Sequence, residues 1–95
     1  MTARPDSATR FFTGLAAATR MLRADADLSQ HEVAERGRLS PRFVSDVEHE
    51  RANPRYRQLD QLAHGLGLAG GAPQLVTLAV EAADRIEAAT IRPSD

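Results

Sequence analysis

The 95-residue chain is long enough for one compact domain with a single hydrophobic core. It has no cysteine, which excludes disulfides, thiolate metal sites and cysteine nucleophiles. Its 42% hydrophobic and 26% charged residues place it among ordinary soluble proteins. No apolar run approaches the roughly 20 residues that span a bilayer, and the N-terminus lacks a signal-peptide core. We therefore expect a cytoplasmic protein that does not contact a membrane.

The net charge is only −1, but the charges are unevenly distributed along the chain. Between residues 36 and 57, six arginines stand against three acidic residues. From residue 58 onward, five acidic residues outnumber two arginines. Local positive charge favours binding to nucleic-acid phosphates even when the total charge is near zero. Any nucleic-acid contact is therefore expected in the middle of the chain.

The first predicted helix follows a polar segment. Residues 1–7 carry polar side chains and a proline and are predicted to be a loose tail. Apolar residues then recur at the three- to four-residue spacing of one helix face, namely Phe11 or Phe12, Leu15, Ala18 and Leu22. This stripe predicts a helix from about residue 7 to residue 24.

Residues 28–48 indicate two short helices joined by a tight turn. Ser29 followed by Glu32 is a capping box, which predicts a helix over about 29–36. Ser40 followed by Pro41 is a second helix start and predicts a helix over about 40–49. The apolar residues between these signals fall where two crossed helices would face each other. Such a pair suits the DNA major groove, with the second helix as the reader.

The C-terminal half predicts two further helices. Asn53 and Pro54 mark a loop, after which a helix is expected over about 55–66, weakened and ended by Gly65 and Gly67. A last helix is expected over residues 72–91, followed by a tail at 92–95. Its apolar residues have heptad spacing: Leu75, Ala79, Ala82, Ile86 and Ala89. Because four helices already form a compact bundle, we expect this face to pack on a second copy, with packing inside one chain as the alternative.

The segment from residue 15 to residue 68 contains one combined pattern, formed by Leu28-Ser29-Gln30, Glu32, Val33-Ala34, Leu39-Ser40, Val44, Val47-Glu48, Pro54, Leu59, Leu62-Ala63 and Leu66-Gly67. In this pattern the chain resembles the Cro/repressor-type helix-turn-helix domains, the XRE family of lambda-repressor-like folds. The resemblance implies an all-α bundle of about five helices, with the DNA-binding domain at residues 8–68 and a dimerisation helix after it. It also implies an operator in double-stranded DNA as partner, a homodimer, and a partly buried pair between Arg23 and Glu48.

The resemblance and the side-chain chemistry together predict a DNA-binding surface. Its expected members are Ser29, Gln30, Ser40, Pro41, Arg42, Phe43, Ser45, Asp46, His49, Arg51 and Asn53. The two helix starts present free amides to phosphate. Arg42 can present its guanidinium fork to guanine. Phe43 either meets a thymine methyl group or fills the gap between the two helices, and Asp46 either accepts from cytosine or orients Arg42.

Two positions depart from the family pattern. The family usually has glycine at the turn position that Arg38 occupies here, so either Arg38 is left-handed or the turn shifts by one residue. The family also commonly has glycine at the position of Glu50, which puts a carboxylate near the expected DNA backbone.

These observations predict a sequence-specific DNA-binding transcription regulator, a dimeric repressor that reads a two-fold symmetric operator. The alternative is an antitoxin or adaptor whose C-terminal helix binds a partner protein such as a toxin. An enzyme is not expected, because the three histidines are scattered and no nucleophile–base pair or glycine-rich phosphate loop is visible. No cofactor or metal is expected.

Overall fold

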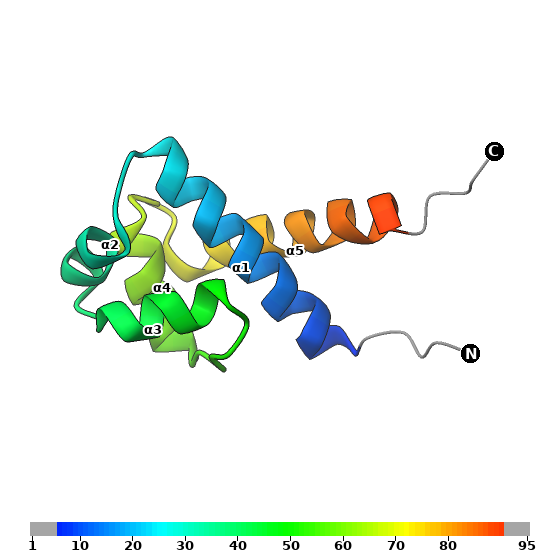
Figure 1. Ribbon diagram of the computed structural model, residues 1–95, viewed down its shortest axis with the longest axis horizontal. Coiled ribbons are helices and arrows are strands. Elements are labelled where there is room, and N and C mark those ends of the chain that lie inside the picture. Colours follow the sequence, from blue (N-terminus) through cyan, green and yellow to red (C-terminus); the bar gives the residue numbers. More distant parts are fainter. Residues whose placement is uncertain (1–5, 91–95) are drawn as a thin grey trace.

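A computed structural model of the chain describes residues 6–90 and contains five helices there (Figure 1). Their bounds are α1 (Ser7–Asp25), α2 (Gln30–Gly37), α3 (Pro41–Glu48), α4 (Tyr56–Gly65) and α5 (Gly71–Thr90). No strand occurs within residues 6–90, so the predicted all-α bundle of about five helices is confirmed. The C-terminal end of α5 projects from the body that the other helices form (Figure 1).

The start of α1 is fixed by a side-chain cap. The Asp6 carboxylate accepts the Thr9 backbone N–H at 2.7 Å, which satisfies one of the amides left free at a helix start. The tail predicted for residues 1–7 is therefore too long by two residues, because Asp6 caps the helix and Ser7 opens it. Residues 1–5, the predicted tail at 92–95 and Ile91 lie outside the described part of the chain.

Both predicted start signals in the central helix pair cap their helices. Ser29 and Glu32 form the complete capping box, with hydrogen bonds of 3.0 and 2.9 Å. The Ser40 hydroxyl oxygen accepts the Phe43 N–H at 3.0 Å. Arg38, after α2, adopts the left-handed conformation with φ 58° and ψ 43°, so the turn does not shift. A non-glycine residue in this conformation costs about 1–2 kcal/mol, which the surrounding helix pair must offset.

Two glycines let α2 and α4 approach each other closely. A Cβ atom on Gly37 would lie 2.5 Å from the carbonyl oxygen of Gln61. A Cβ atom on Gly65 would lie 2.4 Å from the carbonyl oxygen of Val33. Gly65, predicted only to weaken and end its helix, is thus also a contact point between two backbones.

A residue from the preceding helix caps the start of α5. The Asp60 carboxylate, on α4, accepts the Ala72 N–H at 3.0 Å. The Gln74 side chain accepts the Gly70 N–H at 2.8 Å. Pro73 is the third residue of α5 and lies in its first turn, where a missing N–H costs nothing. The start of α5 is therefore joined to α4.

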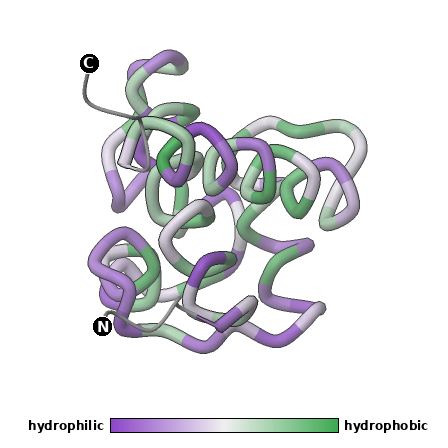
Figure 2. The backbone as a smooth tube through the Cα atoms, turned by 90° about the vertical axis from the view of Figure 1, so that its right-hand side faces the viewer, coloured by the Kyte–Doolittle hydropathy of each residue, from purple (hydrophilic) through white to green (hydrophobic). Residues whose placement is uncertain are grey.

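All five helices contribute to one hydrophobic core. Its most enclosed side chains include one from each helix, all at most 1% exposed: Leu15, Val33, Val44, Leu62 and Leu75. Along the backbone, hydrophobic and hydrophilic stretches alternate within the helices, as expected for helices with one buried face (Figure 2). Thr19 is also fully buried, and its hydroxyl has no hydrogen-bond partner among the described residues.

The helix α5 crosses α1 within the same chain. At the crossing, a Cβ atom on Gly14 would lie 2.0 Å from the Ala79 carbonyl oxygen. Beside it, Arg10 pairs with Glu87 and with Asp84, the latter at 3.3 Å. Three of the residues predicted for a dimer contact are buried in this intrachain packing, namely Leu75, Ala79 and Ala82. These three are buried within one chain, whereas Ile86 and Ala89 are exposed.

The close crossing predicts that Gly14→Ala destabilises the protein. At a solvent-exposed position of a helix, the same change raises the free energy of unfolding by about 1 kcal/mol, because alanine has the higher helix propensity. Here the new methyl group meets the backbone of Ala79, so α1 and α5 must separate, and we expect a loss of about 2–3 kcal/mol in the free energy of unfolding. Urea unfolding of the parent protein and of Gly14→Ala measures this difference in free energy. A variant more stable than the parent protein would contradict the close packing of α1 on α5.

Candidate nucleic-acid interface

The starts of α2 and α3 present capped helix ends that can meet phosphate. The hydroxyl oxygens of Ser29 and Ser40 accept backbone amides, so their hydroxyl protons remain available for donation to an acceptor outside the chain. Both serines are exposed. The positive end of each helix dipole adds an attraction for an anion at the same place.

The helix α3 has one buried face and one outward face. Val44 and Val47 are buried in the core. On the opposite face, the Arg42 side chain is 90% exposed. Arg42 Nε lies 3.9 Å from a carboxylate oxygen of Asp46, one turn along the helix. At that distance Asp46 steers the guanidinium by charge but leaves its donors free for another partner.

The other predicted residues of α3 are only partly accessible. Phe43 is half-buried and packs against the core, which favours its gap-filling role over contact with a thymine methyl group. Pro41 and Ser45 are half-buried as well. The exposed surface of α3 among these residues is thus narrow and centred on Arg42.

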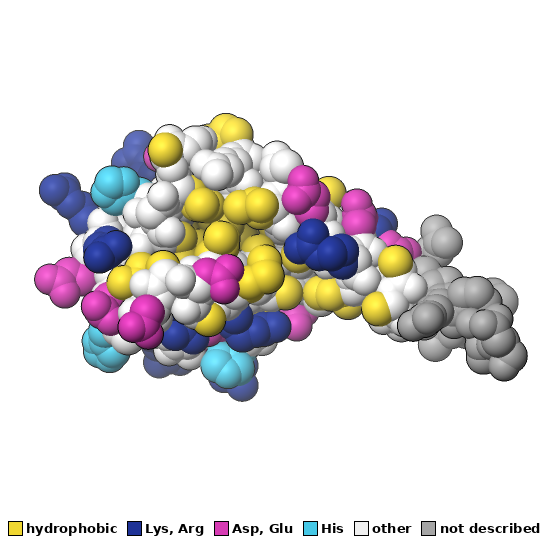
Figure 3. Space-filling view, turned by 90° about the horizontal axis from the view of Figure 1, so that it is seen from above, with side chains coloured by type: hydrophobic (Ala, Val, Ile, Leu, Met, Phe, Trp, Pro, Cys, Tyr) yellow, Lys and Arg dark blue, Asp and Glu magenta, His cyan; other side chains and the backbone are white. Residues whose placement is uncertain are grey.

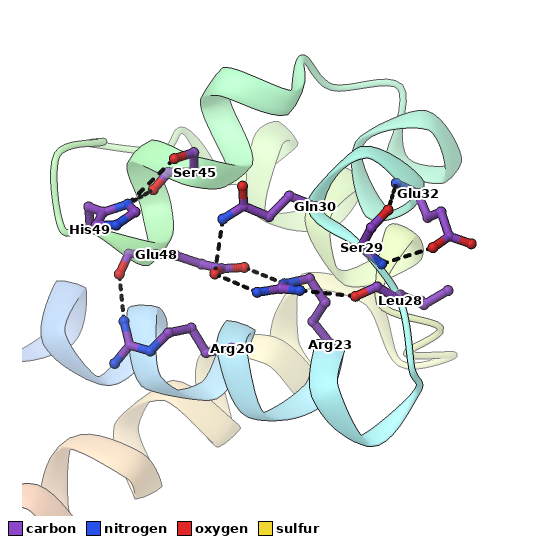
Figure 4. A network of polar contacts seen from close by, with 9 residues as sticks. All are labelled: Arg20, Arg23, Leu28, Ser29, Gln30, Glu32, Ser45, Glu48 and His49. Carbon is purple, nitrogen blue, oxygen red and sulfur yellow. Dashed lines mark hydrogen bonds and ion pairs between the residues drawn. The ribbon is translucent and has the colours of Figure 1, made fainter.

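The segment after α3 is exposed and carries several polar side chains. His49, Arg51 and Asn53 are all exposed. The His49 ring nitrogen Nδ1 lies 2.8 Å from the Ser45 carbonyl oxygen (Figure 4). Because a carbonyl only accepts, we assign the Nδ1 proton to this bond, which leaves Nε2 as the ring atom able to meet another group.

A buried carboxylate joins α3 to α1 and α2. Glu48, whose side chain is 4% exposed, accepts hydrogen bonds from Arg23 Nε at 2.7 Å and Arg23 Nη2 at 3.0 Å (Figure 4). Gln30 Nε2 donates to the same carboxylate at 3.1 Å. Arg23 also donates to the carbonyl oxygen of Leu28, at 3.0 Å. The Arg23–Glu48 pair is therefore one part of a larger network, and the amide of Gln30 is directed to Glu48 rather than outward.

This network determines the protonation of Glu48. Burial by itself would raise the pKa of the Glu48 carboxyl. The hydrogen bonds from Arg23 and Gln30, together with the charges of Arg23 and Arg20, outweigh the burial and hold the pKa below its usual range. The same hydrogen bond raises the pKa of the Arg23 guanidinium. Glu48 thus remains ionised in the folded protein.

Several structural contacts near the site have no local signal in the sequence. Arg20 Nη1 donates to the Glu48 carbonyl oxygen at 2.5 Å, and Thr13 donates to Glu50 at 2.5 Å. Both join α1 to residues far along the chain, 28 and 37 positions away, so they become visible only once the helices are placed.

The depressed pKa of Glu48 predicts that stability falls in acid. Because the folded-state pKa lies below the unfolded value of about 4.3, the stabilisation is present above that value. It is lost as the pH falls through the folded-state pKa. We expect Glu48→Gln to cost about 3 kcal/mol at neutral pH and to flatten the decline in unfolding free energy below about pH 5.

Denaturant titrations over this pH range measure the effect. Glu32→Gln is the matched control, because Glu32 also has a lowered pKa, from its hydrogen bonds with Ser29, but is solvent-exposed. A pH profile of the Glu48 variant that parallels that of the parent protein would contradict the role of the buried pair.

Comparison with known proteins gives one family and two similar structures. Residues 15–75 match a family described as a helix-turn-helix domain. Two crystal structures of the clp gene regulator ClgR from Corynebacterium glutamicum are similar, both at 28% sequence identity. One has a TM-score of 0.73 and an alignment covering 84% of this chain and 83% of that one; the other has a TM-score of 0.65, covering 82% and 94%. No curated protein matches.

Neither a membrane-spanning helix nor a metal-binding cluster is found among the described residues. No helix in residues 6–90 is long and apolar enough to cross a membrane. Within the same residues, no three histidine, aspartate or glutamate side chains gather where they could hold a metal ion.

Proposed function

This chain belongs to the helix-turn-helix domain family, and on that basis we propose that it is a DNA-binding transcription regulator that reads its site with α3. The observation that carries the proposal is the outward position of Arg42, whose side chain is 90% exposed near the start of a helix otherwise anchored in the core. An anchored helix presents its outer side chains at fixed positions, as base recognition requires. The similarity to ClgR, a gene regulator, supports the same class of function.

Contacts to the DNA backbone would surround α3. The exposed starts of α2 and α3, at Ser29 and Ser40, suit phosphate on one side. Beyond the other end of α3, phosphate can be contacted by three exposed polar residues, His49, Arg51 and Asn53. Such contacts fix the register of the protein on the duplex, while Arg42 distinguishes bases by its bidentate fit to guanine.

The finer proposal is a dimeric repressor on a two-fold symmetric operator. Two copies of α3 would occupy successive major grooves, with half-site centres roughly 34 Å apart or a multiple of that distance. Repression then follows from occupation of the operator. Regulation within residues 6–90 would depend on protein concentration, on dimerisation or on a partner, because these residues form a single helical domain.

The projecting end of α5 is the proposed dimer surface. A cavity of about 280 Å³ opens between α1 and α5, lined by Ala17, Met21, Ala82, Arg85, Ile86 and Ala89. Met21 and Ile86 are 46% and 38% exposed. The apolar stripe of α5 continues past its crossing with α1, so its last turns have no cover within residues 6–90, and exposed apolar side chains are visible on the face in Figure 3. A second copy can cover this groove with its own α5; a different partner protein is the alternative occupant.

The role of Arg42 predicts a specific change in base preference. Arg42→Ala should relax the preference at one position per half-site, by about 1–3 kcal/mol of discrimination. Arg42→Lys is the matched variant, since it keeps the positive charge but loses the planar fork. Selection from a random DNA pool, followed by binding measurements over a range of salt concentrations, tests both.

For a DNA reader, log affinity should fall linearly with log salt concentration. The Arg42→Lys protein should keep nearly the parent salt slope while losing the base preference. An unchanged preference in both variants would remove Arg42 from the reading role, and a parent protein with no affinity for DNA at low salt would refute the proposed function.

The groove predicts that Ile86→Asp yields monomers. A carboxylate in the apolar groove would have to be buried without a partner, which makes the association unfavourable by several kcal/mol. Val80→Asp is the control, since Val80 is also exposed, at 46%, but does not line the groove. Sedimentation of the parent and both variants measures the oligomeric state. Dimers that survive Ile86→Asp would place the contact elsewhere.

A further inference from the structure

The turn that follows α3 has an unusual backbone conformation for its sequence. Glu50 has φ 59°, in the left-handed region. Its N–H donates to the Val47 carbonyl oxygen at 3.2 Å, and the next N–H, from Arg51, donates to the Asp46 carbonyl oxygen at 2.7 Å. Glycine adopts this conformation without a steric penalty, whereas glutamate does not. The conformational preference of glutamate does not favour this turn, so contacts with other residues must hold it.

A hydrogen bond from α1 reaches this turn. The Thr13 hydroxyl donates to the Glu50 carboxylate at 2.5 Å. The same hydroxyl lies 3.1 Å from the Thr9 carbonyl oxygen. A hydroxyl has one proton, and the nearer, charged acceptor forms the stronger bond. Thr13 thus fixes the direction of the Glu50 side chain.

The direction of this side chain matters because of its neighbours. Glu50 lies between His49 and Arg51, two residues proposed above to contact phosphate. A carboxylate free to move in that segment would approach the DNA backbone and repel it. Its bond to Thr13 instead turns the charge toward α1, on the protein side of the turn.

The remainder of the α3 exit is held independently of Thr13. Arg20 donates to the Glu48 carbonyl oxygen, and Arg23 holds the Glu48 carboxylate. Loss of the Thr13 hydroxyl therefore releases Glu50 and its turn but leaves α3 anchored.

We propose that Thr13, on α1, is a positioning residue for DNA binding, which clamps the Glu50 carboxylate away from the DNA and fixes the left-handed turn after α3. This inference rests on the proposed function. It assigns a role in DNA binding to a residue that lies on a different helix from the reading surface.

Four variants test the clamp: Thr13→Val, Thr13→Ser, Glu50→Gln and the double variant Thr13→Val/Glu50→Gln. The probe is the duplex that the parent protein selects from a random-sequence pool. At low salt, Thr13→Val should weaken binding about tenfold, whereas Thr13→Ser, which keeps the hydroxyl, should bind like the parent protein. Glu50→Gln should bind at least as tightly as the parent protein, and the double variant should bind like Glu50→Gln.

The double variant separates the clamp from a general structural role. If Thr13→Val weakens binding equally in both backgrounds, Thr13 does not act through the Glu50 charge and the proposal fails. Unchanged binding by Thr13→Val would overturn it directly.

Amide hydrogen exchange gives a readout that does not depend on DNA. The Arg51 amide should exchange faster in Thr13→Val than in Thr13→Ser, because its turn is released. Equal exchange in the two variants would overturn the clamp whether or not DNA binds. A parent protein that selects no DNA would refute the proposed function while the exchange result still decides the clamp.

Discussion

The buried carboxylate of Glu48 is the constraint on which the arrangement of α3 depends. A charge removed from water is costly unless it is paired and fully hydrogen-bonded. Here Arg23 provides two donors and Gln30 a third. The donors come from α1 and from the first residue of α2, while the carboxylate is the last residue of α3. Three helices must therefore keep their relative positions, or the charge is left unpaired.

This constraint explains how an eight-residue helix can have a defined orientation. Isolated helices of this length are unstable in water. The helix α3 is held at its start by Ser40, along one side by Val44 and Val47 in the core, and at its end by Glu48. Only its outward side is left unconstrained by packing, and Arg42 lies there.

The sequence predicted the parts of the fold that depend on local signals. The starts of α2 and α3 agree with the predictions to within one residue, because Ser29 with Glu32 and Ser40 with Pro41 act on amides only a few residues away. The close contact at Gly14 and the cap that Asp60 places on α5 were not predicted. Both depend on residues from two separate helices, whose approach no short pattern encodes.

The predicted dimer face illustrates a second limit. The heptad spacing of α5 correctly reports one continuous apolar side. It does not report what covers that side. Packing on α1 of the same chain and packing on a second copy both require apolar residues at these positions. In the structure, the apolar side of α5 has two parts. Leu75 and Ala79 are buried within the chain, while Ile86 and Ala89 are exposed. The candidate DNA contacts were predicted mainly from the resemblance, since exposed polar side chains leave little periodic trace.

The close crossing at Gly14 has a mechanical consequence. At Gly14, α1 touches the backbone of α5 without an intervening side chain. Elsewhere along α1, Arg20 and Thr13 donate hydrogen bonds to Glu48 and Glu50 at the end of α3. The helix α1 therefore contacts both α5 and the end of α3, and it links the two parts of the chain. A change in the packing of α5 on α1 would therefore also affect the contacts that α1 makes with Glu48 and Glu50 at the end of α3.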